Sequence, residues 1–133
     1  ITLDQVEGRT VDLELVIRPE DKTKVYEKFE LRFAENEKYH SALSFRPHES
    51  VLKIDRKFSG SERAVIHQRR CQVNKDSDEL KLRVVLDRYS VEVFINDGEQ
   101  VMSAVILTDQ DAKGISFFAD GAAKIDLVKY DLV

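Results

Sequence analysis

Residues 86–98, with the sequence LDRYSVEVFINDG, decide the fold of this chain of 133 amino acids. In the run 91–95, valine and isoleucine occupy every second position, which is the spacing of a strand with one buried face. Phe94 fits this alternation less cleanly than Glu92 does. Residues 87–90 and 96–98 flank the run, and both are short and contain residue types that tight turns favour. The stretch therefore predicts two hairpin turns around the middle strand of an antiparallel meander.

The same period of two extends over most of the chain. Residues 11–17, 29–33 and 80–86 carry apolar side chains at alternate positions. Turn-forming residues separate the further candidate strands, which lie at 39–45, 51–54, 64–73, 101–107, 115–119 and 125–132. About ten short strands with one-sided alternation predict an all-β fold. We expect a single domain over residues 1–133, a β-sandwich of two antiparallel sheets of the jelly-roll or concanavalin-like type.

Composition narrows the classes of partner and location. Hydrophobic residues make up 42% and charged residues 35%, as in a globular domain, and the formal net charge is −4 with both signs interspersed. Nucleic acid and anionic membranes require clustered Lys and Arg, so neither partner is expected. No apolar run reaches the roughly 20 residues of a membrane span. The single cysteine, Cys71, and the absence of an Asn-x-Ser/Thr sequon favour a reducing, cytoplasmic setting.

Three carboxylates in the opening stretch raise the question of acid–base catalysis. A pair of glycosidase carboxylates stands about 5–10 Å apart, and one of them has a raised pKa. Asp87 and Asp97 flank opposite ends of one strand, so at about 3.3 Å per residue they are about 30 Å apart. Glu92 lies midway and reaches neither of them. We therefore interpret Asp87 and Asp97 as turn residues and Glu92 as a solvated side chain, and we identify no catalytic residue.

The sequence does not support metal or thiol chemistry. His40, His48 and His67 are scattered singly, and one cysteine cannot build a zinc site. Positive charge beside Cys71 could activate its thiol, but strand alternation sends Arg70 to the opposite face. We expect Cys71 to be a small core or semi-buried residue, and we expect no metal and no cofactor.

Among the other possible functions, sugar binding has the most support from the sequence. Sandwich modules bind sugars by stacking aromatic rings on apolar sugar faces. Tyr39 and Tyr89 are the candidate carbohydrate-binding residues, and Tyr26 is a further candidate platform. The chain has seven Phe, four Tyr and no Trp, so aromatic side chains are not enriched. Core or cross-strand packing explains most of these rings more simply.

The chain resembles the C-terminal β-sandwich module of glycoside hydrolase family 32, which includes invertases, sucrose-6-phosphate hydrolases, levanases and inulinases. The most specific resemblance covers residues 80–98, a leucine-rich strand followed by a D-R-S-S-V-E-V-F-x-N-D-G-like hairpin. The segments VLKIDRKFSG (51–60) and GISFFADG (114–121), with a closing strand at 125–132, also match the module's pattern. Tyr89 stands where Ser is commoner and Tyr130 where Trp is frequent, so the subfamily stays open.

The resemblance implies an accessory role. In that family, an N-terminal five-bladed β-propeller carries the Asp nucleophile, the Glu acid/base and a second Asp that stabilises the transition state. Their usual motifs, N-D-P-N-G, E-C and R-D-P, do not occur in this chain, so no catalytic residue is carried over. The implied role is to stabilise and orient the propeller of a parent enzyme that hydrolyses sucrose, sucrose-6-phosphate or a fructan.

Two other classes stay open beside that role. A lectin-like binding module would bind sugar as an isolated domain. A free-standing glycosidase would need two acidic residues that meet on one concave face. The partner implied by the resemblance is the propeller of the parent chain, packed on a fairly polar surface of roughly 600–1,500 Å². The docking face and homo-oligomer formation are undecided at the level of the sequence.

Overall fold

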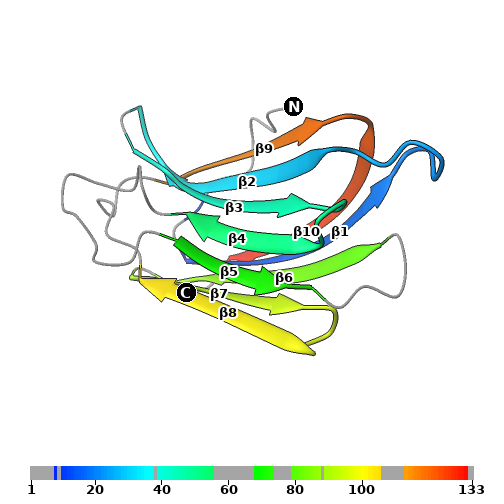
Figure 1. The fold of residues 1–133 in the computed structure, drawn as a ribbon. Helices are drawn as coiled ribbons and strands as arrows, with labels where there is room; N and C mark the ends of the chain where they lie inside the picture. Colours follow the sequence, from blue (N-terminus) through cyan, green and yellow to red (C-terminus); the bar gives the residue numbers. More distant parts are fainter. Residues whose placement is uncertain are drawn as a thin grey trace.

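A computed structural model describes residues 8, 10–37, 39–55, 68–73, 79–87, 89–105 and 113–131. These residues form ten strands and no helix, so none of their elements is a helix that could cross a membrane (Figure 1). The strands are β1 (Val11–Pro19), β2 (Lys28–Glu35), β3 (Ser41–Arg46), β4 (Val51–Asp55), β5 (Gln68–Gln72), β6 (Leu80–Leu86), β7 (Ser90–Ile95), β8 (Gln100–Val105), β9 (Gly114–Asp120) and β10 (Ala123–Asp131).

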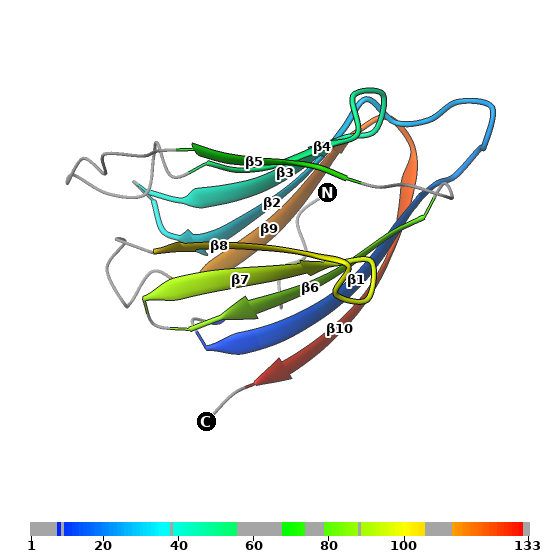
Figure 2. The same cartoon turned by 60° about the horizontal axis from the view of Figure 1, so that its bottom comes forward.

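The strands form two five-stranded sheets that lie face to face, as Figure 2 shows. The order is β10-β1-β6-β7-β8 in one sheet, which we call the β1 sheet, and β5-β4-β3-β2-β9 in the other, the β2 sheet. Every pair of neighbouring strands is antiparallel. The predicted β-sandwich of two antiparallel sheets is therefore confirmed.

The alternating apolar residues fill the space between the two sheets. Leu13 and Ile17 of β1 and Phe29 and Phe33 of β2 are all fully buried. Phe29 also lies against Phe117 of β9, with ring centroids 6.4 Å apart. Burial of one such Leu, Ile or Phe side chain stabilises a fold by about 1.5–3 kcal/mol. The continuous core contributed by both layers is thus the main stabilising feature of the sandwich.

The opening stretch forms the centre of a meander, as predicted. Val93 of β7 pairs with Val84 of β6 on one side and with Met102 of β8 on the other. All three side chains are buried, so they form one row on the core side of the β1 sheet. The outward positions of the same strands form the surface described below.

The β7–β8 turn uses the positive φ angles that its sequence predicts. Asn96 and Asp97 adopt φ angles of 49° and 61°, and Gly98 follows at 88°. The Asn96 side-chain oxygen accepts a hydrogen bond from the Lys81 N–H at 3.2 Å. The Asn96 N–H in turn donates to the Lys81 carbonyl at 2.8 Å. The turn is therefore held against the start of β6.

A side chain joins the two sheets where β8 lies over β5. Gln100 donates from Nε2 to the Gln72 carbonyl oxygen at 2.7 Å and to Cys71 Sγ at 3.3 Å. Cys71 is partly buried against the core, which confirms the predicted semi-buried position. On the opposite side of the sandwich, the chain passes from one sheet to the other through the β9–β10 turn at Gly121.

Candidate functional site

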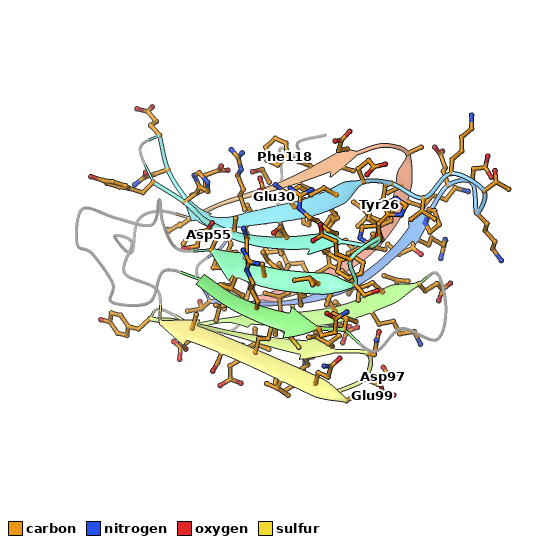
Figure 3. The ribbon with its side chains drawn as sticks, viewed as in Figure 1. Tyr26, Glu30, Asp55, Asp97, Glu99 and Phe118 are labelled. Atoms are coloured by element: carbon orange, nitrogen blue, oxygen red, sulfur yellow. The ribbon has the colours of Figure 1, made fainter. Side chains whose placement is uncertain are left out.

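The three carboxylates of the opening stretch lie where the sequence predicts them. Asp87 occupies the β6–β7 turn, and its N–H donates to the Ser90 carbonyl at 2.9 Å. Asp97 lies in the turn at the other end of β7, with Oδ2 3.8 Å from Lys81 Nζ (Figure 3). Glu92 is exposed in the middle of β7. The interpretation of Asp87 and Asp97 as turn residues and of Glu92 as a solvated side chain is confirmed.

Tyr26 is not an accessible platform for a sugar, so that expectation was wrong. Only 2% of its surface is exposed, and burial raises the pKa of its phenol to about 12. The β9–β10 turn packs directly on it, since a Cβ atom at Gly121 would lie 2.9 Å from Tyr26 Cα. Tyr26 lies in the β1–β2 connection, outside the strands (Figure 3). Strand alternation therefore carried no information about its burial.

The β2–β3 turn, which contains Tyr39, and the β6–β7 turn, which contains Tyr89, lie at the same end of the sandwich and connect strands of different sheets (Figures 1 and 2). Tyr39 is half-buried in the β2–β3 turn, and its N–H donates to Asn36 Oδ1 at 2.7 Å. Tyr89 lies in the β6–β7 turn and is 62% exposed. Tyr89 thus has the more accessible ring, and sugar binding at the two residues stays a prediction.

The two described histidines, His40 and His48, lie in different turns, the β2–β3 turn and the β3–β4 turn. His48 Nε2 lies 3.7 Å from Glu27 Oε1, and His67 falls outside the described residues. Burial and the nearby charge of Arg32 lower the pKa of His40 from its ordinary value. Within the described ranges, no three His, Cys, Asp or Glu side chains converge as the ligands of a metal ion would.

The outer face of the β2 sheet is covered by its own charged network. Glu30 Oε2 accepts a 2.8 Å hydrogen bond from Arg32 Nε, and Glu30 Oε1 lies 3.3 Å from Lys28 Nζ. Burial raises the pKa of Glu30, but the two cations outweigh this effect and hold the pKa below its ordinary value. The Arg32 guanidinium also lies 4.5 Å from the ring centroid of Phe118 (Figure 3). The charged side chains on this face are therefore paired with one another, and the aromatic ring contacts one of them.

The outer face of the β1 sheet is more apolar. The strand register aligns Val128, Glu14, Arg83, Phe94 and Val101 in one row across β10, β1, β6, β7 and β8. We call these five residues the cross-strand row. Val101 is 55% exposed and Val128 is 47% exposed, whereas Phe94 is half-buried. Three of the five side chains in the row are thus hydrophobic although they point away from the core.

An ion pair between a buried carboxylate and an exposed guanidinium lies in the middle of this face. Asp12 is only 8% exposed, and both of its carboxylate oxygens accept hydrogen bonds from Arg83 Nε at 3.1 Å. Arg83 Nη2 donates a further bond of 2.6 Å to Asp12 Oδ2. These hydrogen bonds to Asp12 raise the pKa of Arg83 above its ordinary value. The Arg83 guanidinium carbon is 5.9 Å from the ring centroid of Phe94. Several bonds to one carboxylate hold the Arg83 side chain in a defined orientation.

A groove of about 480 Å³ opens on the same face. Val16, Phe94 and Val128 provide apolar lining, and Lys81 and Asp97 provide charged groups. Sites that bind ligands or partner side chains usually combine an apolar lining with a few polar groups in this way. The candidate functional surface of the chain is therefore the outer face of the β1 sheet, with the cross-strand row and this groove at its centre.

The Asp12–Arg83 pair was not predicted from the sequence. The two residues are 71 positions apart, and the antiparallel pairing of β1 with β6 brings them together. Alternation places both on the outward side of their strands, which was the available signal. It could not supply the register, because a strand pairing is set by turns and by the whole core.

Residues 1–132 match the protein family described as "Glycosyl hydrolases family 32 C terminal". The chain is 34% identical, over 98% of its length, to a sucrose-6-phosphate hydrolase of Staphylococcus xylosus and covers 26% of that protein. It is 30% identical, over 84% of its length, to a levanase of Bacillus sp. (strain L7) and covers 12% of that protein. Both relatives are thus far longer than the part that matches this chain.

Among solved structures, an exo-inulinase from Aspergillus awamori resembles the sandwich with a TM-score of 0.84. The superposition covers 100% of this chain and 26% of the inulinase chain, at 20% sequence identity. At that level of identity, the likeness is one of fold. It places the described strands in an arrangement that also occurs within a longer protein.

Proposed function

Because this chain belongs to the C-terminal domains of glycosyl hydrolase family 32, we propose that it is the accessory domain of a longer enzyme that hydrolyses β-fructofuranosyl bonds. The family match over residues 1–132 carries the proposal. The length of the relatives supports it, since the chain spans 26% of the S. xylosus sucrose-6-phosphate hydrolase. The task of the domain is to stabilise and orient an N-terminal catalytic β-propeller.

The carboxylates that perform the hydrolysis then belong to the rest of the parent chain. A retaining glycosidase needs two carboxyl groups about 5–5.5 Å apart, one as the nucleophile and the other as the acid/base. The acidic residues of the opening stretch, Asp87, Glu92 and Asp97, are instead spread along β7 and its two turns. We propose sucrose, sucrose-6-phosphate or a fructan as the substrate of the parent, because the relatives are named sucrose-6-phosphate hydrolase and levanase.

The test compares three proteins: the parent enzyme, the parent truncated before Val11, and the 133-residue chain. Fructose release is measured with sucrose, sucrose-6-phosphate and levan, together with the rate of thermal inactivation. We expect turnover by the parent, faster inactivation of the truncated form, and no turnover by the 133-residue chain. Fructose release by this chain alone, or a parent that hydrolyses none of the three substrates, would contradict the proposal.

A second candidate function, direct sugar binding, is favoured by the exposed ring of Tyr89 at the end of the sandwich. Stacking of an aromatic ring on a sugar needs such an accessible face. An amide NMR titration of the chain with fructose, sucrose, sucrose-6-phosphate and a short fructan tests it. Shifts that cluster near Tyr39 and Tyr89 and disappear in Tyr89→Ala would support binding. Tyr130→Ala is the matched control, since Tyr130 is also exposed but lies on β10. A flat response to all four sugars would reject this function.

A further inference from the structure

We propose that the outer face of the β1 sheet is the surface on which the catalytic remainder of the parent chain packs. The inference rests on the proposed function and adds the face that makes the contact. We define the docking face as the cross-strand row, the adjacent Tyr130 and Asp12, and the groove between β10 and the β7–β8 turn. Asp97 lies in that turn (Figure 3) and lines the groove.

Exposed apolar side chains gather on the docking face. Five large hydrophobic residues of the described chain are exposed, and three of them, Val101, Val128 and Tyr130, lie on this face. Val101 is on the edge strand β8, whereas Val128 and Tyr130 are on the opposite edge strand β10. Phe94 lies between them and lines the groove. Glu14 and Arg83 lie between the two apolar groups in the row, so the face combines apolar and charged side chains, as contacts between domains of one chain do.

The outer face of the β2 sheet does not offer an equivalent surface. Its exposed aromatic residue, Phe118, lies beneath the Arg32 guanidinium, which is held in turn by Glu30. The guanidinium covers part of the Phe118 ring, and 36% of this residue stays exposed. The remaining exposed hydrophobic residue, Tyr89, belongs to a turn rather than to a face. Of the five large hydrophobic residues that are exposed in the described part of the chain, one lies on the outer face of the β2 sheet and three lie on the docking face, so the two faces are unequal.

The docking face is also preorganised. Arg83 stands in its centre, and its three hydrogen bonds to the buried Asp12 carboxylate fix the guanidinium beside Phe94. A side chain that is already ordered loses little conformational freedom when a partner binds. Charged groups of both signs surround the apolar residues, since Glu14 and Asp126 line the groove together with Lys81 and Arg83. This mixture suits a protein surface of mixed charge, and it suits neither a polyanion nor a lipid headgroup layer.

The occupant we assign is the part of the same polypeptide that precedes the sandwich. The family match describes a C-terminal unit, and the chain spans 26% of its S. xylosus relative, so about three-quarters of such a protein lies outside it. A covalently tethered domain is present at an effective concentration of about millimolar or more, so a modest apolar area is sufficient for stable contact. Contacts between domains of one chain are typically of this partly polar kind.

Hydroxyl-radical footprinting of the parent enzyme and of the 133-residue chain, read by mass spectrometry, tests the proposal. We expect the oxidation rate of Tyr130 to fall at least five-fold in the parent relative to the isolated chain. Phe118, on the opposite sheet, is the matched control and should react at the same rate in both proteins. An unchanged rate at Tyr130, or protection of Phe118 instead, would overturn the proposal.

Charge-introducing variants of the parent provide an independent measurement. Val128→Glu alters a side chain that is half exposed, so the sandwich itself should still fold. We expect the parent to change from one calorimetric transition to two, and a protease to cleave between the domains at least five-fold faster. Phe118→Glu should leave both properties unchanged. Equal behaviour of the two variants would reject the docking face.

The experiments separate this inference from the proposed function. A parent that hydrolyses fructosides while Tyr130 stays reactive would retain the function and refute the face. A parent without hydrolase activity in which Tyr130 is protected would retain the interdomain contact and refute the function. Light scattering of the 133-residue chain completes the test, since a dimer abolished by Val128→Glu would assign the face to a second copy and overturn the proposal.

Discussion

Replacement of Gly121 by alanine should destabilise the sandwich more than the same replacement at Gly98. Both glycines have positive φ angles, 103° at Gly121 and 88° at Gly98. An alanine held in a left-handed conformation costs about 1–2 kcal/mol. At Gly98, no heavy atom lies within 4 Å of the added Cβ, so this backbone strain is the whole expected effect.

At Gly121, the added methyl group also meets another segment of the chain. Its Cβ would lie 2.9 Å from Tyr26 Cα and 3.2 Å from Tyr26 Cβ. Tyr26 is buried, and its backbone cannot swing aside as the end of a long side chain could. Overpacking of this kind adds about 1–3 kcal/mol. The expected loss for Gly121→Ala is therefore about 2–5 kcal/mol, against about 1–2 kcal/mol for Gly98→Ala.

Urea unfolding of the 133-residue chain, followed by far-ultraviolet circular dichroism, measures both losses. The midpoints should shift while the m-values stay constant, because the surface exposed on unfolding does not change. The difference between the two variants isolates the contact with Tyr26. Equal losses at the two positions would refute the reasoning, since they would show that the β1–β2 connection moves away from the β9–β10 turn without resistance.

Three further predictions concern single side chains. Asn96→Ala should lower the free energy of unfolding by about 2–3 kcal/mol, because alanine cannot accept the Lys81 hydrogen bond and is strained at positive φ; an unchanged urea midpoint would contradict this. Tyr26→Phe should remove a tyrosinate absorbance step near pH 12, and persistence of the step would contradict this assignment. Because the pKa of this phenol is raised, its contribution to the free energy of unfolding is present below its ordinary pKa and is lost as pH rises through about 12. The lowered pKa values of His40 and Glu30 mean that stability falls as pH drops below their ordinary values of 6.5 and 4.5. His40→Gln and Glu30→Gln should flatten the pH profile of the urea midpoint in these two respective windows, and an unchanged slope in either variant would oppose that explanation.

The strands could be predicted because each has one buried side. In β1, β6 and β7, apolar residues at every second position reported directly which side chains enter the core. The turn at Asn96 and Asp97 could also be predicted, since few residue types other than glycine tolerate positive φ. The pairing of strands across the sheet could not be predicted from the sequence. Adjacency of β10 and β1, which are separated by most of the chain, depends on the packing of the complete core.

The features that escaped prediction lie outside simple alternation. Tyr26 is buried by a turn that belongs to a distant part of the chain, so its local sequence resembles that of an exposed connection. Asp12 has the alternation of an outward residue and yet is almost fully buried, because Arg83 of the neighbouring strand folds over it. In both cases, the environment of the residue is created by a segment about 70 or more positions away.

The exceptions to alternation are themselves informative once the register is known. Phe94 interrupted the polar positions of β7 in the sequence, and the structure shows that Val16, Val101 and Val128 are outward apolar residues on the same sheet. On β2 of the other sheet, the outward positions of Lys28, Glu30 and Arg32 keep the expected polarity. Phe118 is the one exposed large hydrophobic residue described on that sheet, whereas the outer face of the β1 sheet carries Val101, Val128 and Tyr130. Departures from the local rules of folding tend to occur where a surface has another task. The clustering of these departures, rather than any catalytic motif, is therefore the sequence signal that points to the docking face.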